Sequence, residues 1–124
     1  MTGQLEVARG YLDALVSHDG AGVAFAPGAV RYEMGIKTGR SGAHLRRSLS
    51  RGPQYRVIRR IYDLAATVDG DLVRTTYRLD AGLFGRRLAT VRVDEDFLIP
   101  AAVPVIHRID AWIRLPRGAH PTSE

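Results

Sequence analysis

The stretch LATVRVDEDFLIPAAVPVIHRIDAWIRL, residues 88–115, contains the pattern that decides the fold. Apolar and polar residues alternate over residues 88–97 and again over residues 104–115. This period of two is typical of β-strands with one buried face. A loop that contains Pro100 joins the two runs, so residues 88–115 predict two consecutive strands.

Two ionisable residues lie on faces that are otherwise apolar. Glu95 shares its face with Val93 and Phe97, and His107 shares its face with Ile109. Buried ionisable side chains are rare unless they are paired, so both positions need a reason.

An antiparallel register can bring these two residues together. If Phe97 pairs with Val105, Glu95 lies opposite His107, and the preceding strand places Tyr77 on the same surface. Opposite side chains are about 4.5–5.5 Å apart at Cβ, which permits a hydrogen bond. A carboxylate can fix the imidazole tautomer while the imidazole moves a proton near neutral pH. The same pair could instead close a buried polar network without chemistry, and the sequence leaves both readings open.

Composition places the chain among ordinary globular proteins. It has 124 residues, of which 45% are hydrophobic and 25% charged, and we expect one domain over residues 1–115 followed by a frayed tail, 116–124. The absence of cysteine excludes disulfides and thiolate metal sites. No apolar run approaches the roughly 20 residues that span a bilayer, and no signal-peptide pattern is present, so we expect a cytoplasmic location and no membrane contact.

The net charge is +5, and Lys37 is the only lysine. Seven of the arginines form a basic tract: Arg40, Arg46, Arg47, Arg51, Arg56, Arg59 and Arg60. We interpret the tract as a solvated face, with an anionic partner as the alternative. Because no nucleic-acid motif is present, we do not expect nucleic acid as a partner.

The order of expected elements indicates an α+β fold. Helices are expected over residues 4–18, 22–26 and 41–49, and strands over residues 29–34, 55–68, 71–80, 88–97 and 104–115. Helices concentrated at the front of the chain imply three N-terminal helices packed on one face of a curved, mostly antiparallel sheet. We expect such a sheet to form a cone-shaped α+β barrel with a pocket at its wide end.

Three phrases resemble a known family: YLDALVSHD (11–19), FAPGAVRYEMG (25–35) and TGRSGAHLRRSL (38–49). With the element order, they make the chain similar to the nuclear-transport-factor-2-like superfamily, which includes ketosteroid isomerases, limonene epoxide hydrolases and polyketide cyclases. The resemblance covers residues 5–115 and implies the fold, which hosts many activities.

The resemblance also implies roles for individual residues. Tyr11 is similar to the tyrosine that donates to the substrate oxyanion in ketosteroid isomerases, Glu33 to their general base, and Trp112 to a pocket tryptophan. Val93 stands where those enzymes have a protonated aspartate. Strand alternation gives a different answer for Glu33 and Trp112, because it places both side chains away from the core. Glu33 would then pair with Arg31 on the surface.

The sequence therefore predicts a small pocket protein that binds an apolar molecule with a carbonyl or hydroxyl group. Catalysis, if present, would be cofactor-free general acid-base proton transfer, as in an isomerase, cyclase or dehydratase. The catalytic candidates are His107, Glu95, Glu33 and Tyr11. The ligand-binding candidates are Tyr77, Val93, Trp112 and Phe97. No metal or cofactor is expected.

The alternative is a non-catalytic ligand-binding or dimerisation module. The superfamily resemblance implies a homodimer through the outer face of the sheet, where Trp112 would lie among charged residues.

Overall fold

The computed structural model describes residues 3–83 and 86–114, and the expected tail at residues 116–124 lies outside these ranges. The helices are α1 (Gln4–Ser17), α2 (Gly42–Arg51) and the single turn α3 (Pro53–Arg56). The strands are β1 (Phe25–Glu33), β2 (Ile36–Gly39), β3 (Ile58–Asp69), β4 (Leu72–Leu83), β5 (Arg86–Leu98) and β6 (Ile106–Arg114). The predicted α+β class is confirmed.

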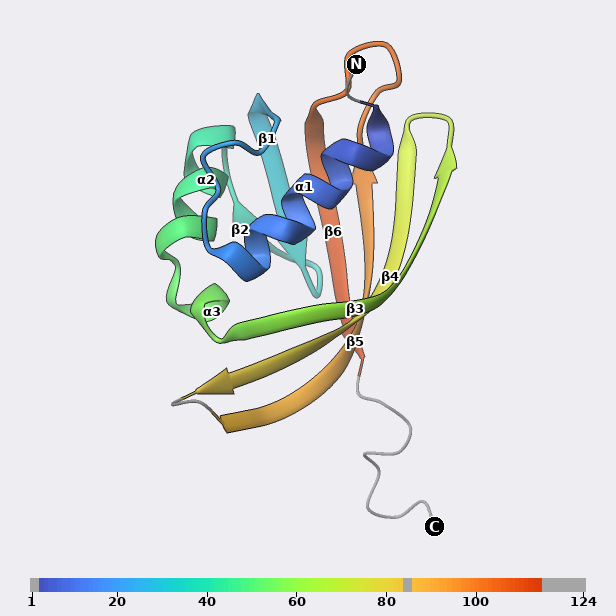
Figure 1. The fold of residues 1–124 in the computed structure, drawn as a ribbon. Helices are drawn as coiled ribbons and strands as arrows, with labels where there is room; N and C mark the ends of the chain where they lie inside the picture. Colours follow the sequence, from blue (N-terminus) through green and yellow to red (C-terminus); the bar gives the residue numbers. More distant parts are fainter. Residues whose placement is uncertain (1–2, 84–85, 115–124) are drawn as a thin grey trace.

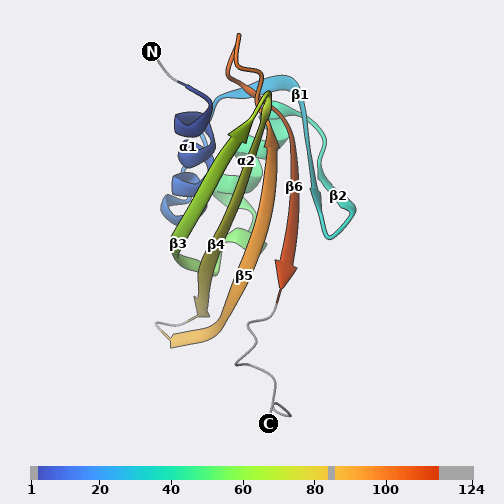
Figure 2. The same ribbon diagram turned by 90° about the vertical axis from the view of Figure 1, so that its right-hand side faces the viewer.

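The six strands form one sheet in the order β2-β1-β6-β5-β4-β3. All neighbouring pairs are antiparallel except β1 and β6, which run parallel. The predicted antiparallel meander from β3 to β6 is therefore confirmed. The sheet is strongly curved, and Figures 1 and 2 show the helices on one of its faces. Because β2 and β3 are its edges, the described part of the sheet is open, and the expected closed cone is not confirmed.

Helix α1 forms because its apolar residues recur at helical spacing. Val7, Ala8, Tyr11, Leu12 and Leu15 are buried and face the sheet. The carboxylate of Glu6 accepts a hydrogen bond from the backbone N–H of Gly3 at 3.1 Å, which caps the N-terminal end. The expected helix over residues 4–18 thus has nearly its predicted bounds.

Two predictions before the meander are wrong. No helix occupies residues 22–26, because Phe25 already belongs to β1 and pairs with Ile106 of β6. The short strand β2 was not predicted; Met34 and Gly35 both have positive φ and turn the chain back into it. Two helices therefore pack on the sheet where three were expected, with α3 as one added turn before β3.

The predicted register of the last hairpin is also wrong. Phe97 pairs with Ile109 instead of Val105, so Glu95 lies opposite Ala111 and not opposite His107. The cause is the connection, residues 99–105, which is longer than the prediction assumed because β6 begins only at Ile106.

The first turn of α2 packs so closely on β1 that only glycine fits. A Cβ added to Gly42 would lie 2.6 Å from the carbonyl oxygen of Ala26, a backbone atom that cannot rotate away. We expect Gly42→Ala to lower the free energy of unfolding by about 1–3 kcal/mol through overpacking. Urea denaturation followed by circular dichroism measures it.

Gly10 provides the matched control, since it is exposed within α1 and an added Cβ meets no atom within 4 Å. Gly10→Ala should raise the free energy of unfolding by about 0.5–1 kcal/mol, because alanine is the better helix former. A stable Gly42→Ala variant would contradict the close packing of α2 on β1.

Candidate functional site

A cavity of about 300 Å³ lies between α1, the start of β3 and the concave face of the sheet. Its lining residues are Tyr11, Leu15, Glu33, Tyr55, Val57, Ile58, Tyr77, Leu79, Ala81, Val91, Val93, Glu95, Ala111 and Ile113. Most of these side chains are apolar, and the polar groups are two carboxylates and three tyrosine hydroxyls. A mostly apolar cavity with a few convergent polar groups is typical of a small-molecule site.

Glu95 is the buried acid of this cavity. Its exposed fraction is 2%, and its Oε1 accepts a hydrogen bond from the hydroxyl of Tyr77 at 2.5 Å. The pKa of Glu95 is raised to about 7, mainly by burial; the hydrogen bond from Tyr77 opposes the rise, and the negative charge of Glu33 contributes to it. Glu95 can therefore gain and lose a proton near neutral pH.

Ala111 separates the two carboxylates of the cavity. This residue of β6 pairs with Glu95 on β5 and with Glu33 on β1. Neighbouring strands are about 4.8 Å apart, so the two glutamate backbones are about 10 Å apart. The small methyl group of Ala111 leaves space between them for a ligand.

Arg31 is fully buried behind the cavity, and its guanidinium contacts several elements. Nε donates to Oγ1 of Thr38 at 3.1 Å, and Nη2 donates to the Thr38 carbonyl at 3.3 Å and to Oγ of Ser48 at 3.2 Å. Nη1 donates to the hydroxyl of Tyr11 at 3.3 Å. The guanidinium carbon also lies 4.6 Å from the ring centre of Tyr55. This buried cation is thus held by hydrogen bonds and an aromatic face.

Glu33 faces the cavity and pairs with Arg31. The distance from its Oε2 to Nε of Arg31 is 3.8 Å, and the same oxygen accepts a hydrogen bond from Tyr55 at 2.7 Å. Strand alternation placed both charged residues on the surface, and this prediction is wrong. Tyr32, which lies between them on β1, contacts the guanidinium of Arg108 with its ring. The family resemblance placed Glu33 correctly.

Three tyrosine hydroxyls line the cavity, but they are not equivalent. Tyr77 donates its proton to Glu95, and Tyr55 donates its proton to Glu33. Tyr11 accepts from Arg31, and its own proton is used in none of the hydrogen bonds among the described residues. Burial is the main cause that raises the pKa of each of the three tyrosines. All three are therefore neutral hydrogen-bond donors at physiological pH.

Five of the eight candidate residues line the cavity: Tyr11, Glu33, Tyr77, Val93 and Glu95. Tyr77 pairs with Val93 and faces the expected surface.

Three candidates lie elsewhere. His107 is exposed, because Ile106 and Ile109 are both buried and the strand does not alternate evenly between them. Phe97 is buried behind the cavity, with its ring centre 5.4 Å from that of Tyr11. Trp112 is 45% exposed and lies on the outer face of the sheet, as alternation predicted.

Two residues of the site were missed by sequence reasoning. Arg31 was considered only as a surface partner for Glu33, and Tyr55 was not among the candidate residues. The phrase Gly52-Pro53 was the available signal for Tyr55, because proline at the first helical position starts α3 and turns Tyr55 inward.

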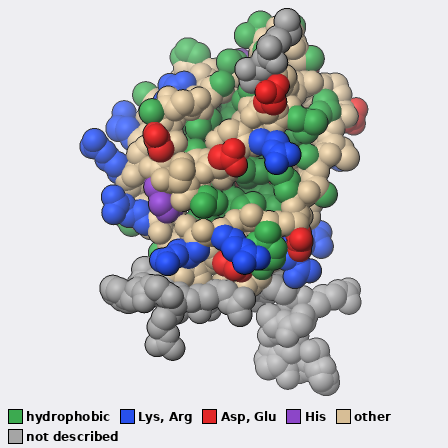
Figure 3. Space-filling view, in the orientation of Figure 1, with side chains coloured by type: hydrophobic (Ala, Val, Ile, Leu, Met, Phe, Trp, Pro, Cys, Tyr) green, Lys and Arg blue, Asp and Glu red, His purple; other side chains and the backbone are tan. Residues whose placement is uncertain are grey.

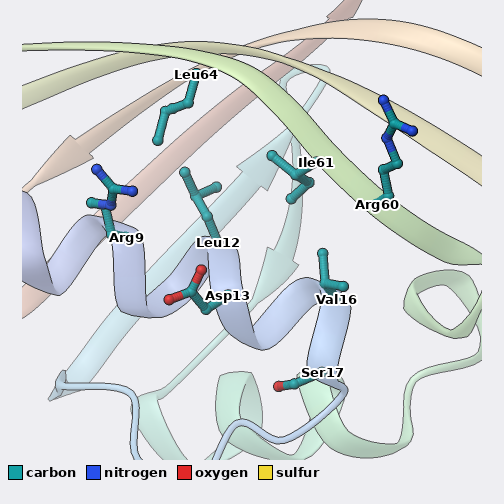
Figure 4. Close-up of a pocket in the computed structure, with 8 residues that line it drawn as sticks. All are labelled: Arg9, Leu12, Asp13, Val16, Ser17, Arg60, Ile61 and Leu64. Carbon is teal, nitrogen blue, oxygen red and sulfur yellow. The ribbon is translucent and has the colours of Figure 1, made fainter.

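A second cleft of about 580 Å³ lies between α1 and β3 (Figure 4). Leu12, Ile61 and Leu64 form its apolar floor, and Arg9 and Arg60 lie at its rim. It is larger than the cavity around Glu95, but none of its ionisable residues is buried. The chemistry of proton transfer therefore favours the cavity around Glu95.

The basic tract lies mainly on the surface of α2 and the segment that follows. Figure 3 shows arginine and lysine side chains gathered on the α2 side of the molecule. Arg40, Arg47 and Arg51 are exposed, whereas Arg46 is partly buried and donates to the carbonyl of Val23 at 3.2 Å. In the described ranges no cluster of three or more His, Asp or Glu residues could hold a metal ion, and none of the helices there could cross a membrane.

Several solved structures have folds similar to that of this chain. A protein of unknown function with a cystatin-like fold from Methylobium petroleophilum has a TM-score of 0.71 at 19% identity, and the match covers 98% of this chain and 81% of that one. A protein assigned as a SnoaL-like polyketide cyclase from Shewanella denitrificans has a TM-score of 0.67 at 15% identity, and the match covers 89% of each chain. A protein assigned as an isomerase of the SnoaL-like family from Agrobacterium tumefaciens has a TM-score of 0.65 at 18% identity, and the match covers 91% of this chain and 98% of that one.

The fold is thus the cystatin-like α+β fold of these structures, in agreement with the fold that the sequence resemblance implied. A family model matches residues 3–113, and the chain belongs to that family, the domain of unknown function DUF8021. No curated protein matches the chain.

The raised pKa of Glu95 predicts a pH-dependent stability. The pKa moves from 4.5 to about 7 on folding, so the folded state binds the proton more tightly than the unfolded state. This contribution is complete below pH 4.5 and is lost as pH rises through 7. Relative to Glu95→Gln, which does not titrate, the wild type should lose about 3 kcal/mol of unfolding free energy over that interval.

Urea denaturation of both proteins between pH 4 and 8 checks this linkage. The control is Asp69→Asn, which replaces an exposed carboxylate at the end of β3 that does not line the cavity, and it should keep the wild-type pH dependence. A constant difference between wild type and Glu95→Gln would show that Glu95 is solvated.

Proposed function

We propose that the cavity binds a compact apolar molecule with a carbonyl or hydroxyl group, and that Glu95 transfers a proton to and from it. The observation that carries the proposal is a buried carboxyl group in an apolar cavity with a pKa of about 7. A general base is most effective when its pKa lies near the working pH. The proposed proton transfer uses side chains of the protein alone and needs no cofactor.

Tyr11 is the hydrogen-bond donor in this proposal. The protons of Tyr55 and Tyr77 are already donated to carboxylates, whereas Tyr11 has its proton available for a ligand oxygen. When Glu95 removes a proton from the carbon beside a carbonyl group, negative charge develops on the oxygen. A donor at that oxygen stabilises the enolate, and Glu95 then returns the proton to a carbon atom. This sequence is an isomerisation, or the first step of a cyclisation or dehydration.

The size and walls of the cavity limit the ligand. Its volume of about 300 Å³ lies at the lower end of the roughly 300–1,000 Å³ found for ligand pockets. Leu79, Val91 and Val93 form apolar walls that favour a hydrocarbon body. Bicyclic ketones match these properties.

Exchange of the α-protons of 2-tetralone in D₂O, followed by NMR, tests the reaction. The wild-type rate should rise with pH and level off above about 7, because only the Glu95 carboxylate accepts the proton. We expect Glu95→Gln to reduce the rate about 10²–10⁴-fold and Tyr11→Phe to reduce it about 10²–10³-fold.

His107→Ala is the control, since its side chain is exposed and does not line the cavity. Exchange that is equally fast in Glu95→Gln would remove Glu95 from the mechanism. Binding of 2-tetralone without exchange would favour the non-catalytic alternative.

The second candidate function is a homodimerisation module that uses the outer face of β6. Trp112 is 45% exposed there and lies against Gly35, whose added Cβ would be 3.7 Å from its ring. Arg108 pairs with Asp110 at 2.8 Å beside it. An exposed tryptophan surrounded by paired charges is typical of interface centres.

Analytical ultracentrifugation of Trp112→Ala tests this surface. If the face forms a dimer, the wild type sediments as a dimer and Trp112→Ala shifts to monomer, because truncating a central tryptophan costs about 2 kcal/mol or more of binding free energy. Val68→Ala, an exposed apolar residue on the edge strand β3, is the matched control. A monomeric wild type at micromolar concentration would end the proposal.

A further inference from the structure

Arg31 is the buried cation closest to the proposed donor, and its contacts restrict that donor. Its side chain has no exposed surface, and its hydrogen bonds run to β2, α2 and α1 through Thr38, Ser48 and Tyr11. A buried guanidinium without such partners would be strongly destabilising. The hydrogen bonds therefore fix the position of Nη1 relative to the Tyr11 hydroxyl.

Donor and acceptor capacity determines where the Tyr11 proton points. A tyrosine hydroxyl has one proton to donate and can also accept, whereas a guanidinium only donates. The oxygen of Tyr11 accepts a hydrogen bond from Nη1 of Arg31, so the hydroxyl proton of Tyr11 cannot point toward Arg31. The ring neighbours of Tyr11 are Phe25 and Phe97, which offer no oxygen acceptor in their side chains. The remaining direction is the cavity, which Tyr11 lines.

The charge of Arg31 adds to this orientation. Its positive charge lowers the pKa of Tyr11, but burial and the negative charge of Glu95 raise it more, so the hydroxyl stays protonated. A protonated hydroxyl beside a cation is a stronger donor than a hydroxyl alone. The carboxylate of Glu33, 3.8 Å from Nε of Arg31, balances part of the positive charge and so reduces the free-energy cost of burying the guanidinium.

We infer that Arg31 is a positioning residue: its hydrogen bond to the Tyr11 oxygen commits the Tyr11 proton to the ligand oxygen. This inference rests on the proposed function, because it concerns the oxygen-binding end of the same cavity. The hydrogen bond from Arg31 to Tyr11 also compensates for the lack of a hydrogen-bond donor in the side chain of Val93, which lines the same cavity. Arg31 acts on the ligand through Tyr11 and does not contact it.

The test uses 2-naphthol, whose absorption spectrum distinguishes the neutral phenol from the naphtholate. The oxygen of naphtholate represents the enolate oxygen of the proposed reaction. Titrations are made in the Glu95→Gln background, because glutamine keeps position 95 neutral, as it is after Glu95 has taken the proton. The readout is the ratio of bound naphtholate to bound naphthol at each pH, which does not depend on turnover.

Arg31→Lys keeps the positive charge but loses the planar fork that reaches Tyr11, Thr38 and Ser48 together. We expect it to lower the ratio of bound naphtholate to naphthol about tenfold, and Tyr11→Phe to lower it at least as much. Adding Arg31→Lys to Tyr11→Phe should change the ratio no further, because Arg31 acts through the missing hydroxyl. Arg46→Lys is the control: Arg46 also donates to backbone and lies over an aromatic ring, but its hydrogen bonds run to Val23 and Phe25 and not to Tyr11.

Ser48→Ala provides a milder variant if Arg31→Lys does not fold. It removes one acceptor of Nη2 while Arg31 and Tyr11 remain, and it should lower the ratio in the same direction by a smaller factor. A ratio that is unchanged in Ser48→Ala and Arg31→Lys, with 2-naphthol still bound, would overturn the positioning role and leave the proposed ligand site standing. Independent, additive effects of Arg31→Lys and Tyr11→Phe would also overturn it. Failure of the parent to bind 2-naphthol would count against the proposed function itself, and the positioning role would fall with it.

Discussion

The burial of one guanidinium determines how the helix side of this molecule is assembled. Arg31 on β1 has its hydrogen bonds to β2, α2 and α1, and its planar face against Tyr55 of α3. A buried cation must have its donors satisfied, so these four elements can take only positions that supply acceptors or an aromatic face. The apolar core supplies most of the stabilisation, but this cation specifies the arrangement around the cavity.

The two carboxylates of the cavity are chemically identical but have different surroundings. Glu33 has a cation and a tyrosine hydroxyl as partners, and its side chain is partly exposed. Glu95 has a tyrosine hydroxyl, apolar walls and no ion pair among the described residues. Identical side chains on the strands either side of β6 therefore lie in different electrostatic environments, and this difference gives the cavity distinct ends.

Periodicity predicted the parts of the fold in which polarity and burial agree. Helix α1 and the meander β3–β6 follow from such patterns, because their apolar residues are the buried ones. Prediction failed where charged residues point inward, as for the buried Arg31 and for Glu33 in the cavity lining, since alternation assumes that charges face water. It also failed for His107, because hairpin register depends on the length of a connection that the residue pattern does not specify. The family phrases placed Glu33 correctly because they record position and not polarity.

The parallel pairing of β1 with β6 has a consequence for the order of folding. Phe25 and Ile106 are neighbours in the sheet although about two thirds of the chain separates them in sequence. Closing so long a loop carries a large entropy loss before any contact compensates for it. During synthesis on a ribosome, β1 can pair with β6 only after β6 has emerged, while β3, β4 and β5 can already pair with one another. The part of the cavity that Glu33, Ala111 and Glu95 line is therefore completed last.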